Sequence, residues 1–194
     1  MRSHSVDVLL AFIIKSQRSH NTLYMLTLHQ ATSSQLSTLL DRPECSDIDG
    51  LQLPTSEEIA PRFWIEFVND QLNQDPQNSF WWSPRSIVVD SLAEGLRQRL
   101  IVGAIGFKGP PDSNGAVEIG YGIVPSQQGQ GFATQAVDLL VKEGFSKAEI
   151  QMIMACTVPM NSASGRVLEK NQFIRDGSKI DPEDGEVWVW RRVR

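Results

Sequence analysis

The chain has 194 residues, of which 41% are hydrophobic and 21% charged, and its formal net charge at pH 7 is −5. This composition is typical of one soluble globular domain and excludes collagen-like, coiled-coil and intrinsically disordered proteins. The acidic balance argues against a nucleic-acid partner, because sequence-independent binding needs a concentrated basic surface.

The first segment in chain order is an apolar run, Val8–Ile14, that ends at Lys15. It is shorter than the ~20 residues that span a bilayer, and no A-x-A cleavage site follows it. We therefore predict an N-terminal extension over residues 1–20 and a single domain over residues 21–194. We expect a cytoplasmic protein that does not bind a membrane.

The first part of the domain begins with a predicted strand at 23–28, where strand formers cluster. Thr32 to Ser34 then offer a helix start. Residues 43–54 are polar and rich in turn formers, which predicts a loop. The capping-box spacing of Thr55 and Glu58 predicts a second helix. Its apolar stripe is expected to carry Ile59, Phe63, Phe67 and Leu72.

Two strands are predicted next, at 80–90 and 99–108. The turn former GPPDSNG at 109–115 makes the strand at 116–124 the antiparallel partner of the one before it. A helix follows from Gly129 and Gly131 to about residue 147. The rest of the sequence predicts a strand at 150–158, a short helix at 161–171, and strands at 173–180 and 186–193. The sum is one α+β domain with a mixed sheet of about seven strands and about four helices.

The segment richest in chemical information is the loop before the helix that follows Gly131. A strand ends at Pro125, and two glycines with G-x-G spacing lead directly into the helix. The first N–H groups of a helix have no partner within it, and the helix dipole favours an anion there. Glycines let a phosphate approach the backbone closely. We therefore predict a diphosphate site at this helix N-terminus.

Two common phosphate-binding motifs do not fit this loop. The Rossmann pattern G-x-G-x-x-G fails because position 134 is Thr, and the P-loop pattern fails because no Gly-Lys-Ser/Thr follows. Another nucleotide-binding fold must account for the loop, or the glycines merely form a tight turn.

The run EIGYGIVPSQQGQGFATQAVDLL, followed by NSASGRVLEKNQF, resembles the GCN5-related N-acetyltransferases. Within them it is most similar to the branch of the ribosomal-protein alanine acetyltransferases. The resemblance covers about residues 22–193. It implies a strongly bent mixed sheet whose fourth and fifth strands splay apart to hold acetyl-CoA.

The resemblance also implies roles for individual residues. Ile123 and Val124 would pair with the pantetheine arm like an extra strand, and Asn161 would contact that arm. Ser164 matches a serine thought to protonate the departing thiolate. The loop residues would wrap the diphosphate mainly through backbone N–H groups; they are Gln128, Gly129, Gln130, Gly131, Phe132 and Ala133.

The sequence departs from the family pattern at five positions. The signature Q/R-x-x-G-x-G/A begins here with Ser126, and the usual arginine before its first glycine is Gln128. The loss of that positive charge is expected to weaken cofactor binding. Gln135 stands where Glu is frequent, and Gln172 where Gly precedes Phe. Leu168 replaces the tyrosine that many members use as general acid.

Acetyl transfer needs a neutral amine, so a base or a water chain leading to one is useful. Glu118 is the first candidate, because strand alternation places it on one face with Gly120 and Gly122, whose small size leaves room for a substrate. The alternative is that it pairs with a cation. Glu183 is a second candidate, or a solvated turn carboxylate. A backbone N–H near Val124 is expected to polarise the thioester carbonyl.

The cysteines, the histidines and the large aromatic residues predict no further metal, catalytic or substrate site. Cys45 and Cys156 give no metal-ligand spacing, and all three histidines fall within the first 29 residues, so we predict no metal. Cys156 is expected to be an inert buried thiol. Four aromatic residues are expected to fill the core rather than line a substrate site: Phe63, Trp64, Trp81 and Trp82.

The resulting hypothesis is an acetyl-CoA-dependent N-acetyltransferase in which an amine attacks the thioester directly in a ternary complex. The acceptor is a protein N-terminus, a small amine or an amino sugar, and a homodimer is possible. One alternative is a non-catalytic CoA-binding regulatory or interaction domain with the same fold. Another is a different α+β domain with a chance G-x-G loop.

Overall fold

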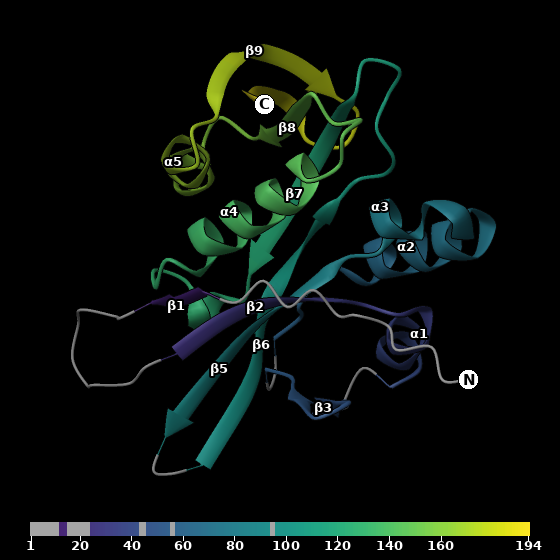
Figure 1. Ribbon diagram of the computed structural model, residues 1–194, viewed down its shortest axis with the longest axis vertical. Helices are drawn as coiled ribbons and strands as arrows, with labels where there is room; N and C mark the ends of the chain where they lie inside the picture. Colours follow the sequence, from purple (N-terminus) through teal and green to yellow (C-terminus); the bar gives the residue numbers. More distant parts are fainter. Residues whose placement is uncertain (1–11, 15–23, 43–45, 55–56, 94–95) are drawn as a thin grey trace.

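The computed structural model describes residues 12–14, 24–42, 46–54, 57–93 and 96–194. Within these residues, ten strands form one mixed sheet with the main order β1-β2-β5-β6-β7-β8-β10-β9, accompanied by five α-helices (Figure 1). The predicted α+β class is confirmed. The strands beyond the predicted seven are β1, β3 and β4, and the helix beyond the predicted four is α3.

Part of the apolar run near the N-terminus belongs to the sheet. β1 (Phe12–Ile14) pairs antiparallel with β2 (Tyr24–Gln30), with Phe12 opposite Leu26. The rest of the predicted extension over residues 1–20 lies outside the described residues, and its boundary with the domain stays a prediction.

The first helix begins where the sequence indicates. In α1 (Ser33–Asp41), the Thr32 side chain accepts a hydrogen bond from the Gln35 N–H at 3.2 Å, and the Gln35 side chain accepts one from the Thr32 N–H at 3.0 Å. This capping box satisfies two N–H groups at once. The predicted loop at 43–54 contains two short strands, β3 (Asp47–Ile48) and β4 (Leu51–Gln52). They were not predicted, because a two-residue strand is too short to show an alternating pattern.

The second helix differs from its prediction. α2 (Arg62–Gln74) begins after Pro61, so Glu58 precedes it, and Thr55 lies outside the described residues. The predicted apolar stripe is wrong for Phe63 and Phe67, whose side chains are 63% and 48% exposed. Ile59 precedes the helix, and Leu72 is buried as predicted. The rest of the buried face is formed by Ile65 and Val68, which pack with Leu36 of α1. This second stripe also has helical spacing, so the contact with α1 decides between the two.

A single helical turn replaces the start of a predicted strand. α3 (Ser79–Trp82) precedes β5 (Arg85–Ala93), although the sequence SFWW is rich in strand formers. The Asp75 carboxylate accepts hydrogen bonds from the Asn78 amide at 2.9 Å and from the Trp82 indole N–H at 3.0 Å. These contacts stabilise the turn against the local strand propensity.

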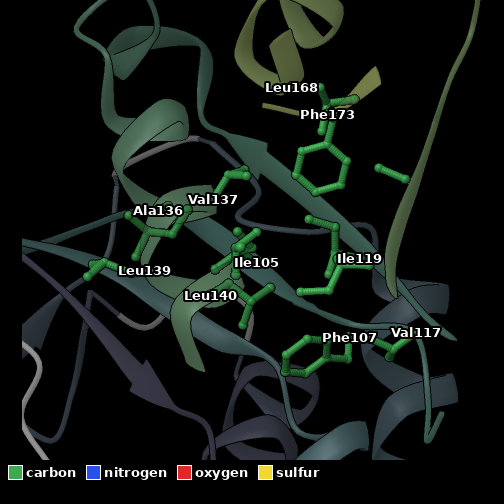
Figure 2. Packing of buried hydrophobic residues seen from close by; sticks show 14 of the residues in the cluster. Ile105, Phe107, Val117, Ile119, Ala136, Val137, Leu139, Leu140, Leu168 and Phe173 are labelled. Atoms are coloured by element: carbon green, nitrogen blue, oxygen red, sulfur yellow. The ribbon is translucent and has the colours of Figure 1, made fainter. Parts of the chain in front are cut away.

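Alternating residues of β5 separate the two faces of the central sheet. Ile87 and Val89 pack with the cluster that includes α4 (Phe132–Phe145), whereas Val88 packs with residues of β3 and β4 on the other face. Figure 2 shows the α4 side against β6 (Leu96–Phe107) and β7 (Ala116–Ile123), with Ile105, Phe107 and Ile119 near Ala136, Val137 and Leu140. Each such aliphatic side chain stabilises the fold by about 1.5–3 kcal/mol, so α4 is held firmly beside β7.

The last elements follow the predicted order: β8 (Met152–Thr157), α5 (Ser162–Lys170), β9 (Ile174–Asp181) and β10 (Gly185–Val193). After α5, Gln172 has a φ of +63°, the left-handed conformation that usually ends a helix at glycine. The family glycine that Gln172 replaces therefore has a structural reason. Glutamine adopts this conformation at a cost of about 1 kcal/mol.

Candidate active site

β7 and β8 run parallel but stay paired over only the first half of β7. The register joins Ala116 to Met152 and ends with Ile119 opposite Ala155, whereas β7 continues to Ile123. On its other side, β7 remains paired with β6 as far as Ile123 opposite Gly103. Residues 120–123 therefore have a free edge where β8 departs. This confirms the opening that the resemblance placed between the family's fourth and fifth strands.

The free edge of β7 presents the backbone groups of Tyr121 and Ile123. In an antiparallel pair a residue directs its N–H and C=O to the same neighbour, and successive residues alternate between neighbours. The Glu118 carbonyl and the Val124 N–H both bond to β6, at N···O distances of 2.8 and 3.0 Å. Tyr121 and Ile123, at odd positions between them, consequently direct their N–H and C=O groups to the side that β8 has left.

This register corrects one expectation about Val124. Its N–H donates to the Val102 carbonyl and its side chain is 2% exposed, so that N–H is not available to polarise a thioester. The N–H of Ile123 faces the free edge instead. The carbonyl of Ile123 accepts a hydrogen bond from the Gln128 side-chain amide at 3.0 Å.

The loop between β7 and α4 carries the two predicted glycines. Gly129 and Gly131 have φ values of +76° and +83°, which glycine adopts without strain. A Cβ built at either position would meet no atom of the described residues within 4 Å. Gly131 is the N-cap of α4, and it provides no side-chain cap. The first N–H groups of α4 are left for an external acceptor, so the loop fits a diphosphate.

The other residues of the loop use their side chains locally. The Gln130 amide donates to the Gln127 side-chain oxygen at 3.0 Å, and Phe132 is buried edge-on against Tyr24. Ala133 lies in the first turn of α4 and is partly buried. These residues can therefore contact a ligand through their backbone N–H groups. The phosphate-binding role assigned to 128–133 stays a prediction.

Glu57 supports the start of this loop. Its carboxylate accepts hydrogen bonds from the Ser126 N–H, at 2.9 Å, and from the Ser126 hydroxyl. Ser126 is the position where the family signature has Gln or Arg, and here the serine has a partner of its own. Glu57 was not predicted from the sequence, because 69 residues separate it from Ser126 and no local pattern indicates the contact.

Asn161 and Ser164 lie at the start of α5, close to β7. The Asn161 side-chain oxygen caps the helix by accepting from the Ser164 N–H at 3.0 Å. The Ser164 carbonyl accepts from the Tyr121 hydroxyl at 3.1 Å, which joins α5 to the free part of β7. Burial raises the pKa of Tyr121 to about 12, so this phenol stays a neutral donor. The side-chain cap of α5 is therefore Asn161.

Glu118 is held by two lysines. Its Oε1 lies 2.6 Å from Lys108 Nζ and its Oε2 lies 3.6 Å from Lys179 Nζ, and its side chain is 25% exposed. The alternative considered for Glu118, pairing with a cation, is therefore present in the structure. The Glu118 carboxylate raises the pKa of Lys179, which keeps that lysine protonated. Neither lysine was singled out from the sequence, because Lys108 follows β6 and Lys179 lies in β9, both outside the segment of Glu118.

Cys156 lies beside this cluster. Burial raises the pKa of its thiol, and the Glu118 carboxylate raises it further. A thiol kept neutral in this way is a weak nucleophile. These surroundings support the expectation of an inert cysteine.

A pocket of about 220 Å³ lies over β6 and β7. Gly120 and Gly122 line it, and a Cβ at Gly122 would meet no described atom within 4 Å. The prediction that these glycines leave room beside the strand is confirmed. The remaining lining residues are Ile59, Ala60, Pro61, Phe63, Trp64, Ala104, Ile105, Gly106, Phe107, Lys108 and Tyr121.

The predicted aromatic core group divides into two parts. Trp81 is 7% exposed and belongs to the core, as expected, and Trp82 is half-buried with its indole on Asp75. Phe63 and Trp64 line the pocket, so the core assignment is wrong for Phe63. The packing of Ile65 and Val68 with Leu36 of α1 leaves Phe63 on the face of α2 that lines the pocket.

The described part of the chain offers neither a metal cluster nor a membrane-spanning helix. Among these residues, no group of three or more His, Cys, Asp or Glu side chains is placed to hold a metal ion. None of the described helices combines the length and the apolar character that a membrane crossing requires.

A protein-family model, the acetyltransferase (GNAT) domain, matches residues 26–174 of the chain. The chain belongs to the GNAT acetyltransferase family. An uncharacterized N-acetyltransferase, p20 of Bacillus licheniformis, is 30% identical over 130 residues, which cover 67% of each chain. This GNAT chain is therefore an N-acetyltransferase, as the sequence predicted.

Solved GNAT structures share the fold at low sequence identity. An acetyltransferase of this family from Bacillus anthracis aligns with a TM-score of 0.57 and 19% identity, over 94% of this chain and 98% of that one. RimL, a ribosomal L7/L12 alpha-N-protein acetyltransferase, was solved in complex with coenzyme A. It aligns with a TM-score of 0.56 and 18% identity, over 87% of this chain and 93% of that one.

Proposed function

We propose that this chain transfers the acetyl group of acetyl-CoA to a primary amine by direct attack within a ternary complex. The observation that carries the proposal is the free edge of β7, which ends beside the open glycine loop at the N-terminus of α4. Acetyl-CoA would supply an activated acyl group as a thioester. The GNAT structure of RimL contains coenzyme A, which supports this donor.

The residues present fit the two parts of coenzyme A. The N–H groups between Gly129 and Ala133 suit a diphosphate, because they carry the positive end of the α4 dipole. The outward N–H and C=O groups of Tyr121 and the N–H of Ile123 suit an extended amide-containing arm, which would add to the sheet as a short strand. Asn161 at the start of α5 remains our candidate for a contact with that arm.

The acceptor amine would lie in the pocket over Gly120 and Gly122. An alkyl amine is mostly protonated at pH 7, so it must lose a proton before it can attack. Glu118 is on the same face of β7, and we assign it the role of general base, which accepts the amine proton through a water molecule. Glu183 is exposed in the β9–β10 turn and is less suited to this role. Ser164, half-buried beside Tyr121, is our candidate donor for the departing thiolate.

Replacing Glu118 by Gln is expected to lower kcat at least tenfold, because an amide cannot accept the amine proton. Acetyl-CoA binding should change by less than about twofold, since Glu118 lies away from the glycine loop. Steady-state kinetics and calorimetric titration measure the two quantities. The loss should shrink as pH rises, because more of the amine is then already neutral.

Lys179→Met is the matched control for this variant. It removes an ion-pair partner of Glu118 and keeps the carboxylate, so its kcat should stay within about threefold of the native value. If Lys179→Met reproduced the loss in full, the role of Glu118 would be structural. Native turnover in Glu118→Gln would remove Glu118 from the mechanism.

Acetyl-CoA is expected to stabilise the native protein. At a concentration of 100 times Kd, the stabilisation should be about 2.7 kcal/mol, and NADH should give none. Thermal unfolding measures this effect, and release of free thiol in the presence of amines measures turnover. Absence of a shift at millimolar acetyl-CoA would contradict the proposed donor. Binding without thiol release from any amine would favour the non-catalytic alternative.

A further inference from the structure

The pocket over β7 has an apolar lining. Phe63, Trp64 and Ile59 form one wall, and none of the described residues that line it carries a carboxylate. The charged residue among the described lining residues is Lys108, whose ammonium is paired with the Glu118 carboxylate. A second ammonium group on an acceptor would find no counter-ion on these walls.

Three carboxylates on elements around this pocket have partners of their own. Glu118 is held on one oxygen by Lys108 and on the other by Lys179. Asp181 accepts hydrogen bonds from two backbone N–H groups of its own turn, and these bonds lower the pKa of its carboxyl. Glu57 is bonded to Ser126. The surroundings that would recognise a polycation, several unpaired carboxylates, are therefore missing among these groups.

The size and the entrance of the pocket favour a compact apolar group. Its volume of about 220 Å³ is below the range of about 300–1,000 Å³ found for drug-sized ligands. Phe63 is 63% exposed and forms part of the wall, so its ring is available to cover a ligand. Burial of an aliphatic or aromatic group against this wall would favour binding through the hydrophobic effect.

We propose that the acceptor is a primary amine on a compact aliphatic or aromatic group with a single positive charge. It is either a free amine or the first residue of a peptide. Polyamines and amino sugars with several amines are excluded as preferred acceptors. This inference rests on the proposed function, because it describes the amine that enters the same site.

The test compares kcat/KM for matched amines by thiol release from acetyl-CoA. Leucinamide and phenylalaninamide should exceed glycinamide at least tenfold, which corresponds to about 1.4 kcal/mol from burial of the side chain. Spermidine and kanamycin, which carry several amines, should be used less well than leucinamide. The peptide Leu-Gly-Gly distinguishes the two sources, because only a site open to a peptide would use it as well as leucinamide.

Two variants of α2 connect the preference to the pocket wall. Phe63→Ala should lower the ratio of kcat/KM for leucinamide over glycinamide at least threefold, because the apolar group loses its cover. Phe67→Ala is the matched control: Phe67 is also exposed on α2 but does not line the pocket, so the ratio should stay within twofold. Phe63 and Phe67 are 63% and 48% exposed, so neither change should unfold the protein.

The outcomes separate this inference from the function beneath it. If acetyl-CoA binds and spermidine or kanamycin gives the highest kcat/KM, the acceptor inference is overturned while the proposed function stands. A ratio near one for leucinamide over glycinamide, or no turnover of either, also overturns it. If acetyl-CoA does not bind at all, the proposed function itself fails.

Discussion

Replacing Gly131 by Glu is expected to raise the Kd for acetyl-CoA more than about a hundredfold, which corresponds to about 2.7 kcal/mol. A carboxylate at the N-cap of α4 would occupy the site where we place the diphosphate and would repel its charge. Space is available, because a Cβ at Gly131 meets no described atom within 4 Å. Strain from its φ of +83° costs about 1–2 kcal/mol, which should leave the protein folded. Calorimetric titration measures the change.

Gly50→Glu is the matched control for this effect. Gly50 has a φ of +78° and similar open space, but it lies in the turn between β3 and β4. The substitution adds the same charge and a similar strain, so its cost in stability should be similar and acetyl-CoA affinity should stay within about twofold. If both variants lost binding equally, strain rather than the anion site would explain the result. Native affinity in Gly131→Glu would show that the phosphates bind elsewhere.

Gly122→Leu is expected to lower kcat/KM at least about a hundredfold while acetyl-CoA affinity changes by less than about fivefold. Leucine is compatible with a strand, and no described atom lies within 4 Å of the Cβ position. The added side chain would fill the pocket where the amine is expected to lie. The backbone of Gly122 bonds to β6, so the outward groups of Tyr121 and Ile123 should be unaffected. Kinetics with leucinamide and titration with acetyl-CoA measure the two effects.

Gly122→Ala provides a graded comparison at the same position. A single methyl group fills less of the pocket, so its effect should lie between those of native glycine and leucine, at about tenfold. Thermal unfolding checks that both variants fold. Equal kcat/KM for the native protein and Gly122→Leu would place the acceptor outside this pocket.

The parts of the site that could be predicted from sequence depend on local physics. The two glycines before α4 need only the backbone preference of their own residues, and the structure places both at positive φ. The face shared by Glu118, Gly120 and Gly122 follows from strand alternation alone. The capping region at Thr32 was also predictable, because its partner Gln35 is three residues away.

The parts that could not be predicted depend on contacts between distant segments. The lysines that hold Glu118 come from the residue directly after β6 and from β9, and Glu57 reaches Ser126 across 69 residues. The face of α2 was misassigned because two stripes had helical spacing and packing on α1 selected one of them. Whether an N–H of β7 faces β6 or the opening depends on register with a partner strand, so the position of Val124 could not be read from its own segment.

The central claim is that backbone N–H groups at the start of α4 hold the diphosphate of acetyl-CoA. Titration of isotope-labelled protein with acetyl-CoA, followed by amide NMR, tests it residue by residue. The account predicts the largest shifts at Gly129, Gly131 and Ala133, with smaller ones at Ile123 and none at Gly50. Saturation with acetyl-CoA that left the three loop amides unchanged would contradict it.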